Sequence, residues 1–203
     1  MHTLIVGNHR VPRAAFVDRL LRELHPCPPL YGYRTVKEPA PVGEREPIYL
    51  YPAAGERRRS KENLLGWCRN QQSEAYPEVF EQWAFLIEEA RPDGLLLLDE
   101  IGPMESRSPR FSAAVLRALA GDVPVLAVVR DKDTPFLKRV RNHPQARAFV
   151  LTEENEEDLF PRVLDFLRRQ LAAKDLVPSA EAETVEDVPC FCQNSNDESE
   201  KKF

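Results

Sequence analysis

Long apolar runs are missing from this sequence. No stretch approaches the roughly 20 consecutive apolar residues that span a bilayer, so no membrane-spanning segment is expected. The first residues also lack the basic start, the longer apolar segment and the small-residue cleavage site of a signal peptide. We therefore expect a cytoplasmic protein without a membrane partner.

Positively charged residues are fewer than negatively charged ones. The chain carries 28 Lys and Arg against 33 Asp and Glu, which gives a formal net charge of −5. General nucleic-acid binding depends on Lys and Arg that face phosphates, and binding to anionic membranes depends on clusters of the same residues. Neither kind of partner is expected for this acidic chain.

Cysteine is rare, and its spacing is uninformative. The four cysteines, Cys27, Cys68, Cys190 and Cys192, form no recognisable disulfide framework. Cys190 and Cys192 make a C-x-C pair, but a structural zinc site usually needs four ligands, and no nearby Cys or His completes a set. No Ser-His-Asp or Cys-His nucleophile arrangement can be argued either.

The sequence does contain an alternation of strand and helix patterns. Short apolar runs predict strands at about 3–6, 95–98, 123–129 and 148–151. Helical spacing of apolar residues predicts helices at about 12–24, 77–91, 109–119, 135–142 and 159–171. The run at 95–98 suits a central parallel strand that is buried on both faces. The alternation predicts a three-layer α/β sandwich with a mostly parallel sheet.

Two segments depart from this alternation. Aromatic and alternating residues among Pro and Gly predict a small antiparallel insertion at about 30–55. From about residue 172 the apolar pattern fades, and the remainder is rich in Glu, Asp, Ser and Asn. We therefore predict one domain over 1–171 and an acidic, disordered tail over 172–203. A protein partner could bind through this tail.

The segment after the first strand lies where a phosphate-binding loop would lie. That loop has the pattern G-x-x-x-x-G-K-[ST] between a strand and a helix. The corresponding residues are Gly7, Asn8, His9, Arg10, Val11, Pro12, Arg13 and Ala14. They are the candidate nucleotide-binding residues.

Three of these residues depart from the pattern. Pro12 replaces the second glycine and removes a backbone N–H that could face a phosphate. Arg13 replaces the compact lysine charge with a planar guanidinium, and Ala14 lacks the hydroxyl that would bind Mg²⁺. The helix N-terminus and the neighbouring basic side chains still favour a weak anion site. The alternative is that Pro12 simply starts an ordinary helix.

Two carboxylates follow the buried strand. Ligands of open α/β sheets bind at the carboxyl ends of the strands, where Asp99 and Glu100 are expected. In P-loop enzymes an acidic residue at this position holds Mg²⁺, and a second one can act on the attacking water. Asp99 is the candidate metal ligand and Glu100 the candidate general base. The alternative is a strand that ends in solvated charge.

The segment Leu97–Glu105, Leu-Leu-Asp-Glu-Ile-Gly-Pro-Met-Glu, is similar to the D-E-I-G-x-M-E segment of the small P-loop nucleoside-triphosphatases of the cancer-related nucleoside-triphosphatase type. Weaker similarities occur at 33–35, 76–81, 124–129, 134–137 and Asn155, so the resemblance covers roughly 1–170. It implies a P-loop fold, Mg²⁺ and hydrolysis of nucleoside triphosphates such as ATP or GTP. Carried over by position, 7–14 is the phosphate loop, Asp99 lies beside the metal and Glu100 is the base.

The departures at Pro12, Arg13 and Ala14 fall on the nucleotide-binding core that the resemblance implies. We therefore predict a divergent nucleoside-triphosphatase-like protein with a degenerate phosphate loop and weak or no hydrolysis. Two alternatives stay open. One is an active Mg²⁺-dependent enzyme in which Arg13 replaces the lysine, and the other is a non-enzymatic interaction scaffold. Arg130, after a late strand, either faces solvent or reaches phosphate charge.

Overall fold

The computed structural model describes residues 1–8, 10–69 and 72–177. Within these residues eight strands form one sheet, in the order β5-β4-β3-β2-β6-β7-β1-β8. The strands are β1 (His2–Gly7), β2 (Leu30–Lys37), β3 (Glu46–Pro52), β4 (Leu64–Arg69), β5 (Gln72–Ala75), β6 (Leu95–Ile101), β7 (Val125–Arg130) and β8 (Ala146–Val150). The helices are α1 (Arg13–Glu23), α2 (Pro77–Trp83), α3 (Phe85–Glu88), the 3₁₀ turn η1 (Glu105–Arg107), α4 (Pro109–Ala120), α5 (Pro135–Arg141) and α6 (Glu156–Ala172).

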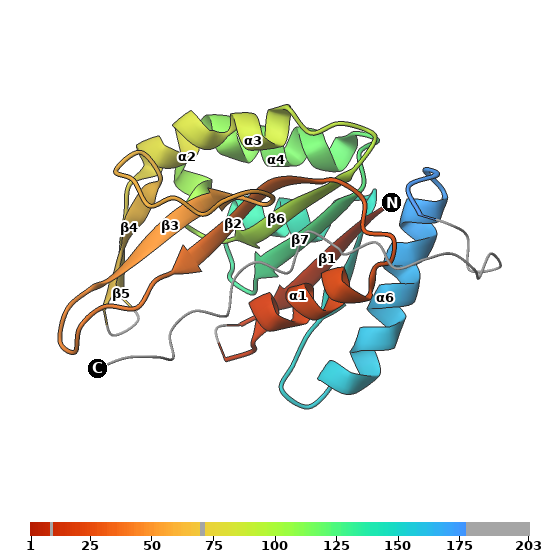
Figure 1. Ribbon diagram of the computed structural model, residues 1–203, viewed down its shortest axis with the longest axis horizontal. Helices are drawn as coiled ribbons and strands as arrows, with labels where there is room; N and C mark the ends of the chain where they lie inside the picture. The colour runs from red at the N-terminus through yellow and green to blue at the C-terminus, as the bar shows by residue number, and fades with distance from the viewer. Residues whose placement is uncertain (9, 70–71, 178–203) are drawn as a thin grey trace, which may run out of the picture.

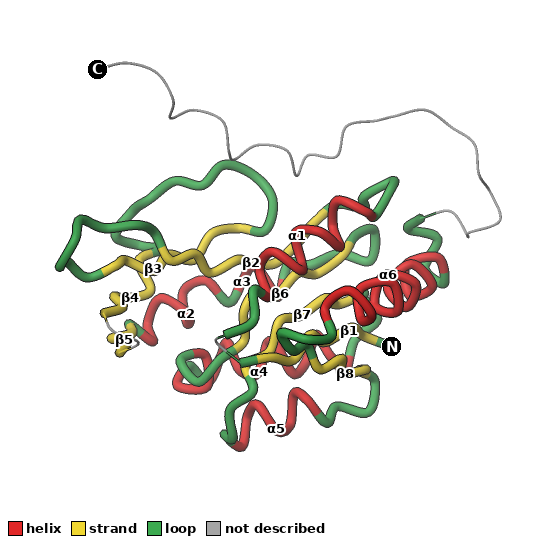
Figure 2. Tube along the Cα trace, turned by 90° about the horizontal axis from the view of Figure 1, so that it is seen from below, coloured by secondary structure: helices red, strands yellow, loops and turns green. Residues whose placement is uncertain are grey.

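Helices cover both faces of the sheet (Figure 1). On one face α1 and α6 pack over β1, β6 and β7, with Phe16 and Val163 in that core. On the other face α2 to α5 pack over the same strands, with Phe80 and Phe111 in the core. Figure 2 shows α1 and α5 on opposite sides of the sheet. The predicted three-layer α/β sandwich is confirmed.

The parallel half of the sheet carries the candidate site. The pairs β2·β6, β6·β7, β7·β1 and β1·β8 are all parallel. Leu95–Leu98 is buried throughout, as expected for a strand covered by helices on both faces. Because neighbouring strands run in the same direction, the carboxyl ends of β1, β6 and β7 meet at one edge of the sheet.

The antiparallel part is larger than predicted. β2 pairs with β3, β3 with β4 and β4 with β5, all antiparallel, so this part reaches Ala75 rather than ending near residue 55. β2 also pairs with β6 in parallel, so it belongs to the parallel part of the sheet as well. The sequence did not predict β4 and β5. β4 contains Gly66, where an added Cβ would lie 1.8 Å from the carbonyl oxygen of Glu74. A strand that needs glycine for such a close approach to its neighbour lacks a clear apolar alternation.

The prediction of one continuous helix at 77–91 is wrong. This segment is divided into α2 and α3, with a turn at Ala84. The N–H groups of Ile87 and Glu88 both donate to the Ala84 carbonyl, at 3.0 and 3.2 Å. This shared acceptor tightens the backbone at the division, which an apolar pattern of helical period does not reveal.

Two other helix starts follow their sequence signals. Ser108 precedes Pro109 and accepts a hydrogen bond from the Phe111 N–H, while Thr134 precedes Pro135 and accepts one from the Leu137 N–H. A hydroxyl cap followed by proline in the first turn is a favourable way to begin a helix. α1 differs, because Pro12 stands at its N-cap position and provides no side-chain cap.

The structure describes a few residues beyond the end of α6. Leu176 packs against the α1–α6 core, and Val177 lies within it. The rest of the predicted tail, with Cys190 and Cys192, lies outside the described residues. In the part of the chain that the structure does describe, every helix is too short or too polar to cross a membrane.

Candidate functional site

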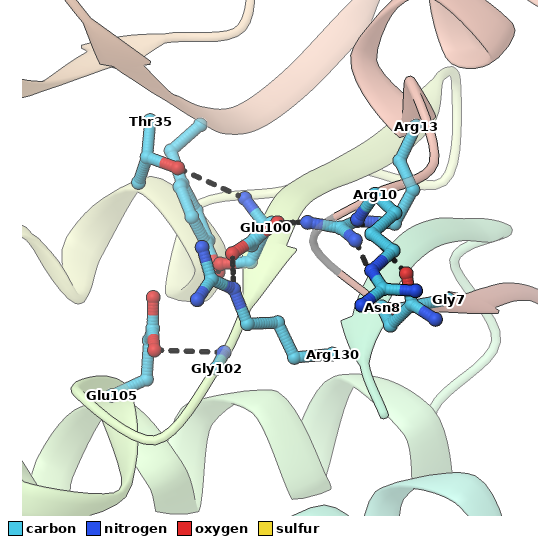
Figure 3. A network of polar contacts seen from close by, with 10 residues as sticks. Gly7, Asn8, Arg10, Arg13, Thr35, Glu100, Gly102, Glu105 and Arg130 are labelled. Atoms are coloured by element: carbon cyan, nitrogen blue, oxygen red, sulfur yellow. Dashed lines mark hydrogen bonds and ion pairs between the residues drawn. The ribbon is translucent and has the colours of Figure 1, made fainter. Parts of the chain in front are cut away.

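The loop after β1 and the end of β6 meet at the carboxyl edge of the sheet (Figure 3). Gly7 ends β1, Glu100 lies near the end of β6 and Arg130 ends β7, the strand between them. Arg13, the first residue of α1, contacts Glu100 from the start of that helix. The structure thus brings together the two motifs that the sequence placed far apart. Of the candidate loop residues, His9 lies outside the described residues.

The backbone of the loop is hydrogen-bonded to itself. The Arg10 N–H donates to the Asn8 side chain at 2.9 Å, and the Val11 N–H points to the Asn8 carbonyl at 3.5 Å. The Arg13 N–H donates to the Val11 carbonyl at 2.8 Å, and Pro12 has no N–H. A phosphate cradle requires successive N–H groups that face an anion. In this loop the N–H groups of Arg10, Val11 and Arg13 are directed to acceptors of the loop itself.

Arg13 is folded into the protein. Its side chain is 8% exposed, and its Nη1 donates to the Gly7 carbonyl at 3.1 Å. It lies over Gly7, because a Cβ at that glycine would be 3.3 Å from the Arg13 Cδ. Its Nη2 lies 2.6 Å from the Glu100 carboxylate. The remaining donor, Nε, is buried and has no hydrogen-bond partner among the described residues. The charge at the position predicted for the P-loop lysine is therefore directed to protein acceptors.

Every polar group of Glu100 has a hydrogen-bond partner. Its Oε2 accepts from Arg13 at 2.6 Å, and its Oε1 accepts from the Arg130 Nε in a close contact. Its N–H donates to the Thr35 hydroxyl at 3.3 Å, and its carbonyl accepts from the Tyr33 hydroxyl at 3.1 Å. A general base must offer its carboxylate to a water, but both oxygens of this carboxylate accept from guanidinium groups.

Asp99 lies on the inner side of this cluster. It is 6% exposed, and its carboxylate is 3.8 Å from Arg34, whose Nη1 also contacts Asp18 of α1 at 2.6 Å. Burial raises the pKa of Asp99 to about 6, although the positive charge of Arg34 opposes this shift. In this arrangement Asp99 helps to connect β6 to β2 and α1. Its role as a metal ligand stays a prediction.

Glu105 is a residue that sequence reasoning did not single out. It is 1% exposed, and its carboxylate accepts the Gly102 N–H at 2.8 Å, which holds the turn after β6. Burial raises the pKa of Glu105 to about 7, and the nearby Glu100 carboxylate adds to the shift. Only its place at the end of the family-like segment could have drawn attention to it.

The donor set, as arranged, does not fit Mg²⁺. Ala14 provides no hydroxyl, Asp99 is buried beside Arg34, and Glu100 is bonded by two arginines. Over residues 1–8, 10–69 and 72–177, nowhere do three His, Cys, Asp or Glu side chains gather as a metal-binding group. A hard cation with oxygen ligands would require carboxylates that are free of these ion pairs.

Comparison with known protein families decides the classification. The family model described as NTPase matches residues 56–164, which is more than half of this 203-residue chain. The chain belongs to the NTPase family. The resemblance seen in the sequence is thereby confirmed. The matched range of this NTPase-family chain contains Asp99, Glu100 and Arg130, and it begins after the loop at 7–14.

Curated relatives are similar over part of the chain. Nucleoside-triphosphatase THEP1 of Thermofilum pendens is 35% identical over 81 residues, which are 39% of this chain and 42% of the relative. Nucleoside-triphosphatase THEP1 of Pyrococcus abyssi is 34% identical over 85 residues, which are 42% of this chain and 45% of the relative. The matched part of the NTPase-family chain thus spans less than half the length of these relatives.

Solved structures are similar in fold over most of the chain. The crystal structure of THEP1 from Aquifex aeolicus has a TM-score of 0.59 and 22% identity, and it covers 82% of this chain and 99% of that chain. The solution structure of a human cancer-related nucleoside triphosphatase has a TM-score of 0.59 and 21% identity, with 83% and 97% covered. At this identity the likeness concerns the fold of the NTPase-family chain.

Proposed function

We propose that this chain is a divergent NTPase-family protein that binds nucleoside triphosphates weakly and hydrolyses them slowly or not at all. The observation that carries the proposal is the ion pair between Arg13 and Glu100, with 2.6 Å between Nη2 and Oε2. It joins the residue that replaces the P-loop lysine to the candidate base. A nucleotide phosphate must then compete with Glu100 for Arg13, and a water must compete with the arginines for Glu100.

The free energy needed to separate this pair lowers the affinity of the site for a ligand, and the size of this loss can be calculated. A hydrogen bond to a charged group contributes roughly 1.5–3 kcal/mol net, so a ligand that must displace Glu100 loses about 10- to 100-fold in affinity. The loop offers little compensation, because Pro12 lacks an N–H and the donors of Arg10 and Arg13 are bonded within the loop. Mg²⁺ would add little, since the carboxylates near the site are buried or paired with arginines.

Calorimetric titration with ATP and GTP, with and without Mg²⁺, tests the binding part of the proposal. We expect no saturable heat in the micromolar range from the wild-type chain. We also expect phosphate release from either nucleotide to be equally slow with wild type and with Glu100→Gln. Micromolar binding strengthened by Mg²⁺, with hydrolysis that disappears in Glu100→Gln, would instead establish an active enzyme in which Arg13 serves as the lysine.

A further inference from the structure

We propose that Arg13 and Arg130 form a binding site for a phosphoryl anion, and that the Glu100 carboxylate occupies this site as an internal ligand. The two guanidinium groups lie on either side of the carboxylate, one bonded to each of its oxygens (Figure 3). This inference rests on the proposed function, because it names the group that a nucleotide would have to displace. It assigns Glu100 the part of an inhibitor rather than a base.

The Arg13 side chain has an anchor besides Glu100, whereas Arg130 is kept near the site by its place in the sheet. Arg13 is fixed by its position at the start of α1 and by its bond to the Gly7 carbonyl at 3.1 Å. Arg130 ends β7, the strand between β1 and β6, and its side chain is 41% exposed. Removal of the carboxylate would therefore leave two cations close together at the carboxyl edge of the sheet.

A phosphoryl group suits these two cations. Guanidinium groups bind carboxylates and phosphates through the same forked donor geometry, so one anion can replace the other. The Arg13 Nε is buried without a hydrogen-bond partner in the described part of the chain, which leaves one donor that Glu100 does not satisfy. A phosphoryl group has more acceptor oxygens than a carboxylate, so it offers an acceptor for this additional donor.

The internal ligand predicts an effect opposite to that of a catalytic base. If Glu100 blocks the site, Glu100→Gln removes the competing charge and binding of a phosphoryl anion becomes tighter. If Glu100 instead supports a water at a working site, wild type already binds the anion without displacing Glu100, and the same substitution mainly lowers turnover. Binding of a probe without a nucleoside separates these two roles.

The experiment is a calorimetric titration of the full chain with tripolyphosphate and with inorganic phosphate, at constant ionic strength. We expect Glu100→Gln to bind tripolyphosphate about 10- to 100-fold more tightly than wild type, which corresponds to release of one charge-assisted hydrogen bond. The matched control is Glu157→Gln. Glu157 is 78% exposed and pairs with Arg19, so this control makes the same chemical change and the same change of net charge away from the site. Its affinity should equal that of wild type.

A double variant locates any gain. Arg13→Gln combined with Glu100→Gln should return the affinity to the wild-type level, because one of the two cations is gone. No gain in Glu100→Gln, an equal gain in Glu157→Gln, or a gain that survives loss of Arg13 would each overturn the inference. Those results would leave the proposed function standing, whereas micromolar ATP binding and turnover by wild type would overturn the proposed function itself.

Stability measurements keep the test decisive if Glu100→Gln folds poorly. Loss of Glu100 leaves the buried Arg13 charge without its partner, so this variant should have a lower Tm than wild type. Tripolyphosphate should raise its Tm by more than it raises that of wild type or Glu157→Gln. Glu100→Asp is the second variant. Its side chain is one methylene shorter, so we expect it to lose one of the two arginine contacts and also to gain affinity. An affinity of Glu100→Asp equal to that of wild type, together with no excess Tm shift in Glu100→Gln, would reject the internal ligand.

Discussion

Gly32→Ala is expected to destabilise this protein strongly. Gly32 has a φ of +91° in β2, a conformation that L side chains rarely adopt. A Cβ there would lie 2.0 Å from the carbonyl oxygen of Leu97 and 2.8 Å from a Leu96 methyl group. Because the first of these atoms is backbone of the paired strand β6, the contact can be relieved only if the two strands separate. We expect a loss of about 4 kcal/mol or more, which is a large share of the stability of a typical domain.

Urea unfolding followed by circular dichroism measures this effect, and Gly43→Ala is its matched control. Gly43 has a nearly equal φ of +89°, but an added Cβ would meet nothing within 4 Å. Its substitution therefore carries the backbone strain alone, which is about 1–2 kcal/mol. Equal losses in the two variants would mean that strain, and not contact with β6, sets the requirement for glycine at position 32.

Glu105→Gln is expected to stabilise the protein above neutral pH. The pKa of Glu105 is raised to about 7 in the fold from an ordinary value of 4.5, with burial as the largest cause. The fold therefore favours the protonated carboxyl, and its contribution to stability is fully present below pH 4.5. That contribution is lost as pH rises through 7, because the buried group must then carry a charge. A shift of this size corresponds to about 3 kcal/mol, and a glutamine side chain has no charge to acquire.

The measurement is the free energy of unfolding of wild type and Glu105→Gln between pH 4.5 and 8. The difference between the two proteins should change in favour of the variant across this range. His2 titrates in the opposite sense, since burial lowers its pKa to about 4, but it is present in both proteins and cancels in the difference. Glu154→Gln, the same change at an exposed position, should follow wild type. If the difference in free energy of unfolding between Glu105→Gln and wild type does not change with pH, the fold does not disfavour a charge on Glu105.

The sequence determined those features that depend on local pattern. The four leucines at 95–98 indicate a buried strand because few other elements are apolar without interruption over that length. Pro109 and Pro135, each after a hydroxyl residue, indicate helix starts because proline is suited to the first turn. Asp99 and Glu100 could be placed at a ligand-binding edge because the carboxyl ends of parallel strands meet there. Each inference uses residues that are close together in the chain.

Only the tertiary structure decided which charges meet. Arg13 and Glu100 are 87 positions apart, and Arg130 is a further 30 positions from Glu100, so no local pattern pairs them. The same holds for Glu105, whose raised pKa comes from burial, and for Gly32, whose requirement comes from a neighbouring strand. A sequence records that a charge or a glycine is present. Whether that charge stays free for a ligand or pairs within the fold depends on distances that only the packing of β1, β6 and β7 sets.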